Sequence, residues 1–93
     1  MTVRVRVPTP LRNLTEGQAD LTSDGESVAG CLAELDQRFP GFSDRILDDE
    51  GEVRRFVNLF VNGEDIRFLE GLVTIVKPGD ELSIVPAMAG GGR

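Results

Sequence analysis

The stretch RFVNLFVN at residues 55–62 decides the fold of this chain. Side chains of this stretch alternate between two faces, with Val57, Leu59 and Val61 on one and Phe56, Asn58 and Phe60 on the other. A two-residue period of this kind predicts a half-buried strand over residues 55–61. The pair Asn62-Gly63 is favoured in tight hairpin turns, so residues 64–66 are expected to return as a short extended segment.

Upstream, residues 2–7 show the same alternation, with valines at every second position between Thr2, Arg4 and Arg6. They predict a first strand, which Pro8 and Pro10 end. Residues 13–17 are typical of a turn, and a weaker strand over 19–22 is expected to return beside the first as a hairpin.

The segment after residue 22 predicts the main helix. Ser23-Asp24-Gly25-Glu26 has the spacing of a capping box, which places the helix start at Ser23. One apolar stripe follows at helical spacing: Val28, Leu32, Leu35 and Phe39. Pro40-Gly41 ends the helix, and residues 41–54 are expected to form an irregular connection with a short helical turn. Its acidic run at 48–52 lacks the spacing of a calcium loop and is interpreted as a solvated loop.

The C-terminal part predicts a last strand that leads into a glycine tail. The turn signal Lys77-Pro78-Gly79-Asp80 precedes an alternation of Leu82, Ile84 and Pro86 with Ser83, Val85 and Ala87. Gly90, Gly91 and Gly92 follow, and Arg93 is last. The predicted fold class is α+β, a mixed sheet of four to five strands with one main helix packed across it. We expect one domain over residues 1–88 and a flexible tail over 89–93.

Composition restricts the classes of function. A formal net charge of −6 repels phosphate backbones and anionic headgroups, so neither nucleic acid nor membrane is an expected partner. No signal peptide is expected, and the single cysteine, Cys31, forms no intramolecular disulfide, so a cytoplasmic location is predicted. The chain has no histidine, the residue most used in acid–base catalysis and metal binding. An active site would have to be built from carboxylates, Lys77, arginines and one thiol, which is a thin catalytic repertoire, and no catalytic residue, metal or cofactor is assigned.

Four segments together resemble one family: RFVNLFVN at 55–62, EDIRF at 64–68, PGD at 78–80 and PAMAGG at 86–91. They are similar to the MoaD/ThiS superfamily of ubiquitin-like sulfur carrier proteins, and within it to the CysO-type carriers of thiocarboxylate-dependent cysteine biosynthesis. The resemblance covers essentially the whole chain and implies a ubiquitin-like β-grasp fold.

The resemblance also implies a function that is not enzymatic. An E1-like enzyme would use ATP to adenylate the C-terminal glycine, and a sulfur donor would convert it to a thiocarboxylate. An acceptor enzyme such as a cysteine synthase would then take the sulfur. The matched ending makes Gly91 the sulfur-carrying residue, with Gly92 the alternative. Because Arg93 lies beyond both glycines, a JAMM-type zinc metalloprotease is expected to remove Arg93, alone or together with Gly92.

Four apolar residues are candidates for partner docking: Phe56, Phe60, Val85 and Ala87. If Val57, Leu59 and Val61 face the helix, these four lie on the opposite face near the tail, where a clustered apolar patch suits docking. The alternative is that the 41–54 connection covers Phe60. Cys31 lies at the edge of the helix stripe and is expected to pack as a small hydrophobe. The free chain is expected to be monomeric.

Two other functions remain open at the level of sequence. One is a ubiquitin-like modifier conjugated to lysines, which needs the same activated glycine. The other is a non-reactive β-grasp interaction subunit. Within the carriers, cysteine, thiazole, molybdopterin and specialised pathways use the same tail.

Overall fold

A computed structural model describes residues 2–86 of the chain. It contains five strands in one mixed sheet of order β2-β1-β5-β3-β4. The strands are β1 (Val3–Arg6), β2 (Asp20–Ser23), β3 (Val57–Val61), β4 (Glu64–Asp65) and β5 (Glu81–Pro86). Central β1 and β5 run parallel, whereas the β1–β2, β3–β5 and β3–β4 pairs are antiparallel. The α+β class and the mixed sheet are thus as predicted.

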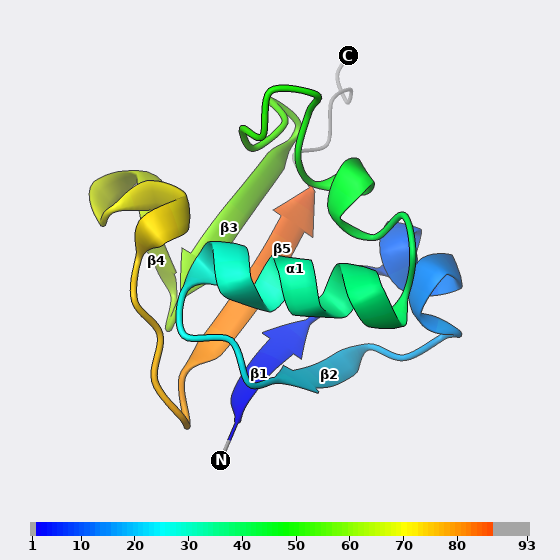
Figure 1. The fold of residues 1–93 in the computed structure, drawn as a ribbon, viewed down its shortest axis with the longest axis horizontal. Coiled ribbons are helices and arrows are strands. Elements are labelled where there is room, and N and C mark those ends of the chain that lie inside the picture. The colour runs from blue at the N-terminus through cyan, green and yellow to red at the C-terminus, as the bar shows by residue number, and fades with distance from the viewer. Residues whose placement is uncertain (1, 87–93) are drawn as a thin grey trace.

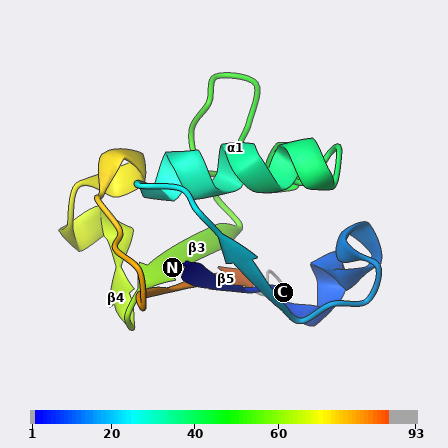
Figure 2. The same cartoon turned by 60° about the horizontal axis from the view of Figure 1, so that its bottom comes forward.

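Helix α1 (Val28–Arg38) crosses one face of this sheet (Figures 1 and 2). Its buried residues Val28, Cys31, Leu32 and Leu35 pack on the inward side chains of β1, β3 and β5. The predicted stripe is confirmed, with Phe39 only partly buried at the helix end. Cys31 is 0% exposed, so it lies within the core and not at its edge.

The helix starts at Ser27, four residues later than the capping box predicted. The Ser27 hydroxyl accepts a hydrogen bond from the Gly30 N–H (3.0 Å), whereas the Ser23 hydroxyl accepts one from the Gly25 N–H (3.1 Å). A second segment explains the delay: Val28 N–H donates to Thr74 O, and Val76 N–H donates to Glu26 O. This long-range pairing, a bridge between Ser27 and Ile75, keeps Ser27 extended, so α1 begins only at Val28 and a tertiary contact overrides the local signal.

Four short 3₁₀ helices join these elements: η1 (Thr9–Thr15), η2 (Ser43–Arg45), η3 (Ile66–Phe68) and η4 (Gly71–Val73). Only η2, the short turn in the 41–54 connection, was predicted. The expected turn at 13–17 is the end of η1, where Glu16 and Gly17 both take positive φ angles. β3 begins at Val57, two residues later than predicted, because Arg55 and Phe56 form a turn.

The acidic run at 48–52 forms a loop that Asp48 organises. Its carboxylate accepts hydrogen bonds from the N–H groups of Glu50 (2.9 Å) and Glu52 (3.0 Å). Both bonds lower the pKa of Asp48 because they stabilise its charged form, and the bond from Glu52 has the larger effect. Within residues 2–86, no helix has both the length and the apolar character that a membrane span requires.

Candidate docking face and root of the tail

The predicted docking residues lie around the face of the sheet that α1 does not cover. Leu59 and Val61 of β3 are 1% and 7% exposed on the helix side, which places Phe60 on the outer side. Phe60 is partly buried and lies opposite Ser83 of β5 and Asp65 of β4. Val85, 42% exposed, lies opposite Asn58 on this same face. The structure therefore brings Phe60 and Val85 onto one outer surface.

The other two predicted docking residues, Phe56 and Ala87, do not lie on the described strands. Phe56 belongs to the turn before β3 and is 55% exposed, so it lies beside the start of that strand and not within it. Ala87 lies outside the described residues, as do Gly90, Gly91, Gly92 and Arg93. The 41–54 connection passes on the helix side of the sheet (Figure 2), so it does not cover Phe60. The alternative reading of Phe60 was therefore wrong.

The root of the tail is fixed by the pairing of β5 with β3. Pro86, the last described residue of the chain, lies opposite Val57, the first residue of β3. The strand thus delivers the chain to the end of the sheet where Phe56 and Val85 are exposed, as Figure 1 shows at the tip of β5. The chain therefore leaves the described part of the domain beside Phe56 and Val85.

The outer face also carries charged side chains. Arg6 on β1 lies 3.7 Å from an Asp20 carboxylate oxygen and 3.6 Å from one of Glu81. The Arg6 side chain is 60% exposed, and pairs at this exposure contribute little to folding stability. The outer face therefore carries Arg6, Asp20 and Glu81 at one end, whereas Phe60 and Val85 lie beside Asn58 and Ser83 on β3 and β5.

The sequence reasoning did not find two polar contacts, of which the first joins the end of β3 to the start of β5. The Asn62 side chain donates to Asp80 Oδ1 (3.0 Å) and accepts from the Glu81 N–H (2.9 Å). Asp80 Oδ2 also accepts from the Lys77 N–H (2.8 Å). Hydrogen bonds from Asn62 and from Lys77 lower the pKa of Asp80. The hairpin signal and the PGD signal are thus two parts of one hydrogen-bonded unit, which spacing in the sequence alone does not reveal.

Asp65 and Arg67 form the second contact. Arg67 Nη2 lies 2.7 Å from Asp65 Oδ2, and Arg67 Nε donates to Asp65 Oδ1 at 3.1 Å. The Asp65 carboxylate also accepts from the Arg67 N–H (2.8 Å) and so caps η3. The Arg67 guanidinium lowers the pKa of Asp65. One sequence signal for this contact was available, because an aspartate and an arginine two positions apart, Asp65 and Arg67, follow the predicted hairpin turn.

A further apolar surface was not predicted. The segment of η3, η4 and the residues after them exposes large side chains, with Phe68 at 79%, Val73 at 68% and Ile75 at 66%. The EDIRF segment was recognised in the sequence, but the exposure of Phe68 was not predicted. An apolar residue in that segment is equally compatible with a buried and with an exposed position.

Cys31 is the only thiol of the chain. Its surroundings are those of a core residue, since its side chain is 0% exposed among Leu32, Leu35 and Val28. Burial raises the pKa of this thiol, which disfavours the nucleophilic thiolate. The expected packing role is consistent with this environment.

The sheet order, the helix across one face and the chain leaving from the central β5 define a ubiquitin-like β-grasp protein. The family model described as "ThiS family" matches residues 5–91. The chain is 41% identical over 93 residues to the sulfur carrier protein CysO of Mycobacterium tuberculosis H37Rv, covering 98% of this chain and 100% of that protein. The chain therefore belongs to the ThiS family.

Solved structures support the same assignment. A chain in the crystal structure of the Amycolatopsis orientalis BexX/CysO complex superimposes with a TM-score of 0.89 at 39% identity, covering 94% of this chain and 97% of that one. The small archaeal modifier protein 1 of Methanosarcina acetivorans has a TM-score of 0.80 at 32% identity, covering 95% and 94%. The chain is thus similar both to a sulfur carrier and to a ubiquitin-like modifier.

Proposed function

We propose that this chain is a sulfur carrier that acts through the carboxylate of its terminal glycine. The observation that carries the proposal is the match of the ThiS family model to residues 5–91, which extends through the predicted sulfur-carrying Gly91. The path of β5 supports it, since the strand runs from the sheet centre directly toward that ending. The similarity to CysO makes cysteine biosynthesis the proposed destination of the sulfur.

The chemistry requires activation of a poor electrophile. A glycine carboxylate attacks the α-phosphorus of ATP on an E1-like enzyme, which forms an acyl adenylate and releases pyrophosphate. A sulfide equivalent then attacks the acyl carbon, AMP leaves, and a thiocarboxylate remains. An acceptor enzyme, such as a cysteine synthase, takes the sulfur. All catalytic groups belong to the partners, so the carrier itself needs no enzymatic activity, no metal and no cofactor.

The encoded ending requires a maturation step before activation. Arg93 follows Gly92, and its long cationic side chain is a poor fit for a slot that accepts glycine. We propose that a peptidase of the JAMM zinc type hydrolyses the bond after Gly91 or after Gly92. Glycines without a Cβ allow the tail to enter a narrow active site.

Docking of the activating enzyme is proposed on the part of the outer face formed by β3 and β5. Phe60 and Val85 lie on this surface and Phe56 is exposed beside the start of β3, all near the point where the tail leaves the domain. Clusters of exposed apolar side chains commonly mark protein–protein contacts. The free chain is proposed to be monomeric, and its compartment the cytoplasm.

The proposal is tested by the intact mass of the protein recovered from its native cells under conditions that preserve thiocarboxylates. The expected product ends at Gly91 or Gly92 and carries the mass of one oxygen-to-sulfur exchange. A matched control is a chain without residues 90–93, which retains the folded domain and should acquire no sulfur. A chain that still ends at Arg93 and is unmodified during sulfur-demanding growth would exclude the carrier function.

A second candidate is a modifier conjugated to lysines, which the similarity to the small archaeal modifier protein favours. Both functions need the same activated glycine, so the tail does not distinguish them. Denaturing blots of cell extract separate the two. Covalent adducts that disappear when residues 90–92 are deleted would support the modifier.

A further inference from the structure

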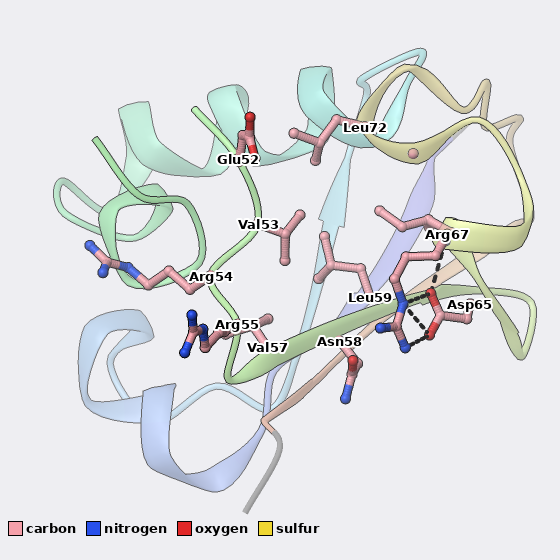
Figure 3. A pocket seen from close by; sticks show the side chains of 12 residues that line it. Glu52, Val53, Arg54, Arg55, Val57, Asn58, Leu59, Asp65, Arg67 and Leu72 are labelled. Carbon is pink, nitrogen blue, oxygen red and sulfur yellow. Dashed lines mark hydrogen bonds and ion pairs between the residues drawn. The ribbon is translucent and has the colours of Figure 1, made fainter. Parts of the chain in front are cut away.

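A groove lies between β3, the segment that enters it and the η3–η4 segment. Its volume is about 320 Å³, within the range of pockets that bind ligands. Apolar side chains line its interior, and Figure 3 shows Val53, Val57, Leu59 and Leu72 around it. The groove is on the sheet edge and is separate from the outer surface formed by Phe60 and Val85.

One wall of the groove is an open strand edge. β3 pairs with β5 along Val57–Val61 but with β4 only at Phe60 and Val61. The chain leaves the sheet after β4 because Asp65 caps η3. Within residues 2–86, the Val57–Leu59 part of β3 therefore has no strand partner on the groove side. Such an edge is a template for another extended chain.

The backbone of β3 is oriented for this pairing. The Asn62 N–H donates to Glu81 O on the β5 side. Since backbone groups alternate along a strand, those of Leu59 point to the opposite side, toward the groove. Val57 agrees with this alternation, because its N–H donates to Arg54 O and not to β5. That bond occupies the Val57 N–H, so the groups left for a new strand on this side are the Val57 C=O and the N–H and C=O of Leu59.

The two ends of the groove differ in charge. Arg67 at one end is neutralised by its ion pair with Asp65. Arg54 and Arg55 stand at the other end (Figure 3). Arg54 Nε donates to Asp44 O (2.9 Å) and the Arg54 charge acts on Asp48, while Glu52 also lines the groove. Arg55 is exposed and forms no ion pair within residues 2–86, so it is the cation at this end that a carboxylate can approach. This is also the end at which Val57 lies opposite Pro86, where the tail leaves the domain.

We propose that this groove binds an extended, acidic-ended segment of an enzyme that acts on the tail. The segment adds to the Val57–Leu59 edge of β3, inserts apolar side chains between Val53 and Leu72, and places a carboxylate near Arg55. The five residues that follow Pro86, through Gly91, span at most about 17 Å, so a partner held here has the terminal glycine within reach.

The binding chemistry is tested without reference to the proposed function. The ¹⁵N-labelled full chain is titrated with the synthetic peptides EEVTVTV and VTVTVEE, which cover both strand directions, and with versions in which lysines replace the glutamates. The expected result is a set of amide shift changes at residues 53–59 and 71–72 with one glutamate peptide only. Absence of binding by both, or equal binding by the lysine versions, would overturn the proposal.

Variants sharpen the titration. Arg55→Glu reverses an exposed charge at the groove and should raise the peptide Kd about threefold to tenfold. Arg45→Glu, the same change on exposed η2, should leave it as in the wild type. Shift changes in the same amides on deletion of residues 87–93, without peptide, would identify the tail as occupant instead. Changes with protein concentration would identify a second copy, and both results would overturn the proposal.

The identity of the partner rests on the proposed function and is tested separately. Intact mass from native cells should show less oxygen-to-sulfur exchange, or less removal of Arg93, in Arg55→Glu than in Arg45→Glu. Equal processing of the two variants would contradict a tail-acting partner at this groove. A wild-type chain without any exchange would instead contradict the carrier function, while the peptide titration still decides whether the groove binds a strand.

Discussion

The two faces of the sheet have opposite properties. On the helix side, Val5 and Leu82 are 0% exposed and Leu59 is 1% exposed, whereas on the outer side Val85 is 42% exposed. Both faces belong to the same strands, so alternate residues of β3 and β5 serve different purposes. The helix face stabilises the domain through packing, and the outer face is available to a partner. Substitutions one residue apart on the same strand should therefore affect different quantities: the free energy of unfolding on the helix side and activity with a partner enzyme on the outer side.

The largest effect is expected on the helix side. Leu59→Ala removes a buried side chain from the centre of β3 and should lower the free energy of unfolding by about 2–5 kcal/mol. Chemical denaturation of the purified chain measures this. A loss below about 0.5 kcal/mol, the range of surface substitutions, would break the distinction between the faces.

A second substitution tests packing beside the helix start. A Cβ on Gly25 would lie 2.5 Å from the Cys31 backbone nitrogen, closer than two such atoms can pack. Gly25→Ala should therefore destabilise the domain by about 1–3 kcal/mol, in the range of overpacked cores. Asp24→Ala, its exposed neighbour, is the matched control for thermal unfolding. Equal melting temperatures of the two variants would show that the helix start adapts without strain.

The outer face should respond in the reverse manner. Phe60→Thr keeps a strand-favouring residue and avoids the repulsion that an acid would meet from Asp65 across the β3–β4 pair. The unfolding free energy should change by less than about 1 kcal/mol, while ATP–pyrophosphate exchange by the activating enzyme falls. If the Phe60→Thr variant does not fold, Phe60 belongs to the core. If the variant folds and supports the same rate of ATP–pyrophosphate exchange as the wild type, Phe60 is not part of the docking surface.

The smallest effect concerns pH. Hydrogen bonds from Asn62 and Lys77 depress the pKa of Asp80, so its folded pKa lies below its unfolded value of about 3.9. Its stabilising contribution is therefore present above about pH 4 and is lost as pH falls through the folded pKa. Asp80→Asn should flatten the acid limb of the stability curve, measured by denaturation between about pH 2 and 6.

The matched control for this pH experiment is Asp49→Asn, which removes the same charge in the exposed acidic loop. It should keep the acid limb of the wild type. If both variants flatten the limb equally, net charge and not the Asp80 contacts sets the acid sensitivity.

The sequence by itself determined the strands, the helix stripe and the family. Alternation in β1, β3 and β5 follows from the pleat, and a period near four in α1 follows from the helix, so local spacing predicts both. The resemblance of four segments to sulfur carriers was confirmed by the family match. The placement of Phe60 and Val85 on one face also followed from spacing, once β3 and β5 were taken as neighbours.

Only the tertiary structure decided the helix start, the η3–η4 segment and the groove. Ser23 and Ser27 both offer a capping hydroxyl, and the pairing of residues 26–28 with 74–76 selects Ser27. The bond between Asn62 and Asp80 joins residues 18 positions apart. The groove exists because β4 stops after Asp65, leaving part of the β3 edge open. These features depend on contacts between residues that are far apart in the sequence. Local sequence patterns carry no information on the free energies of such contacts.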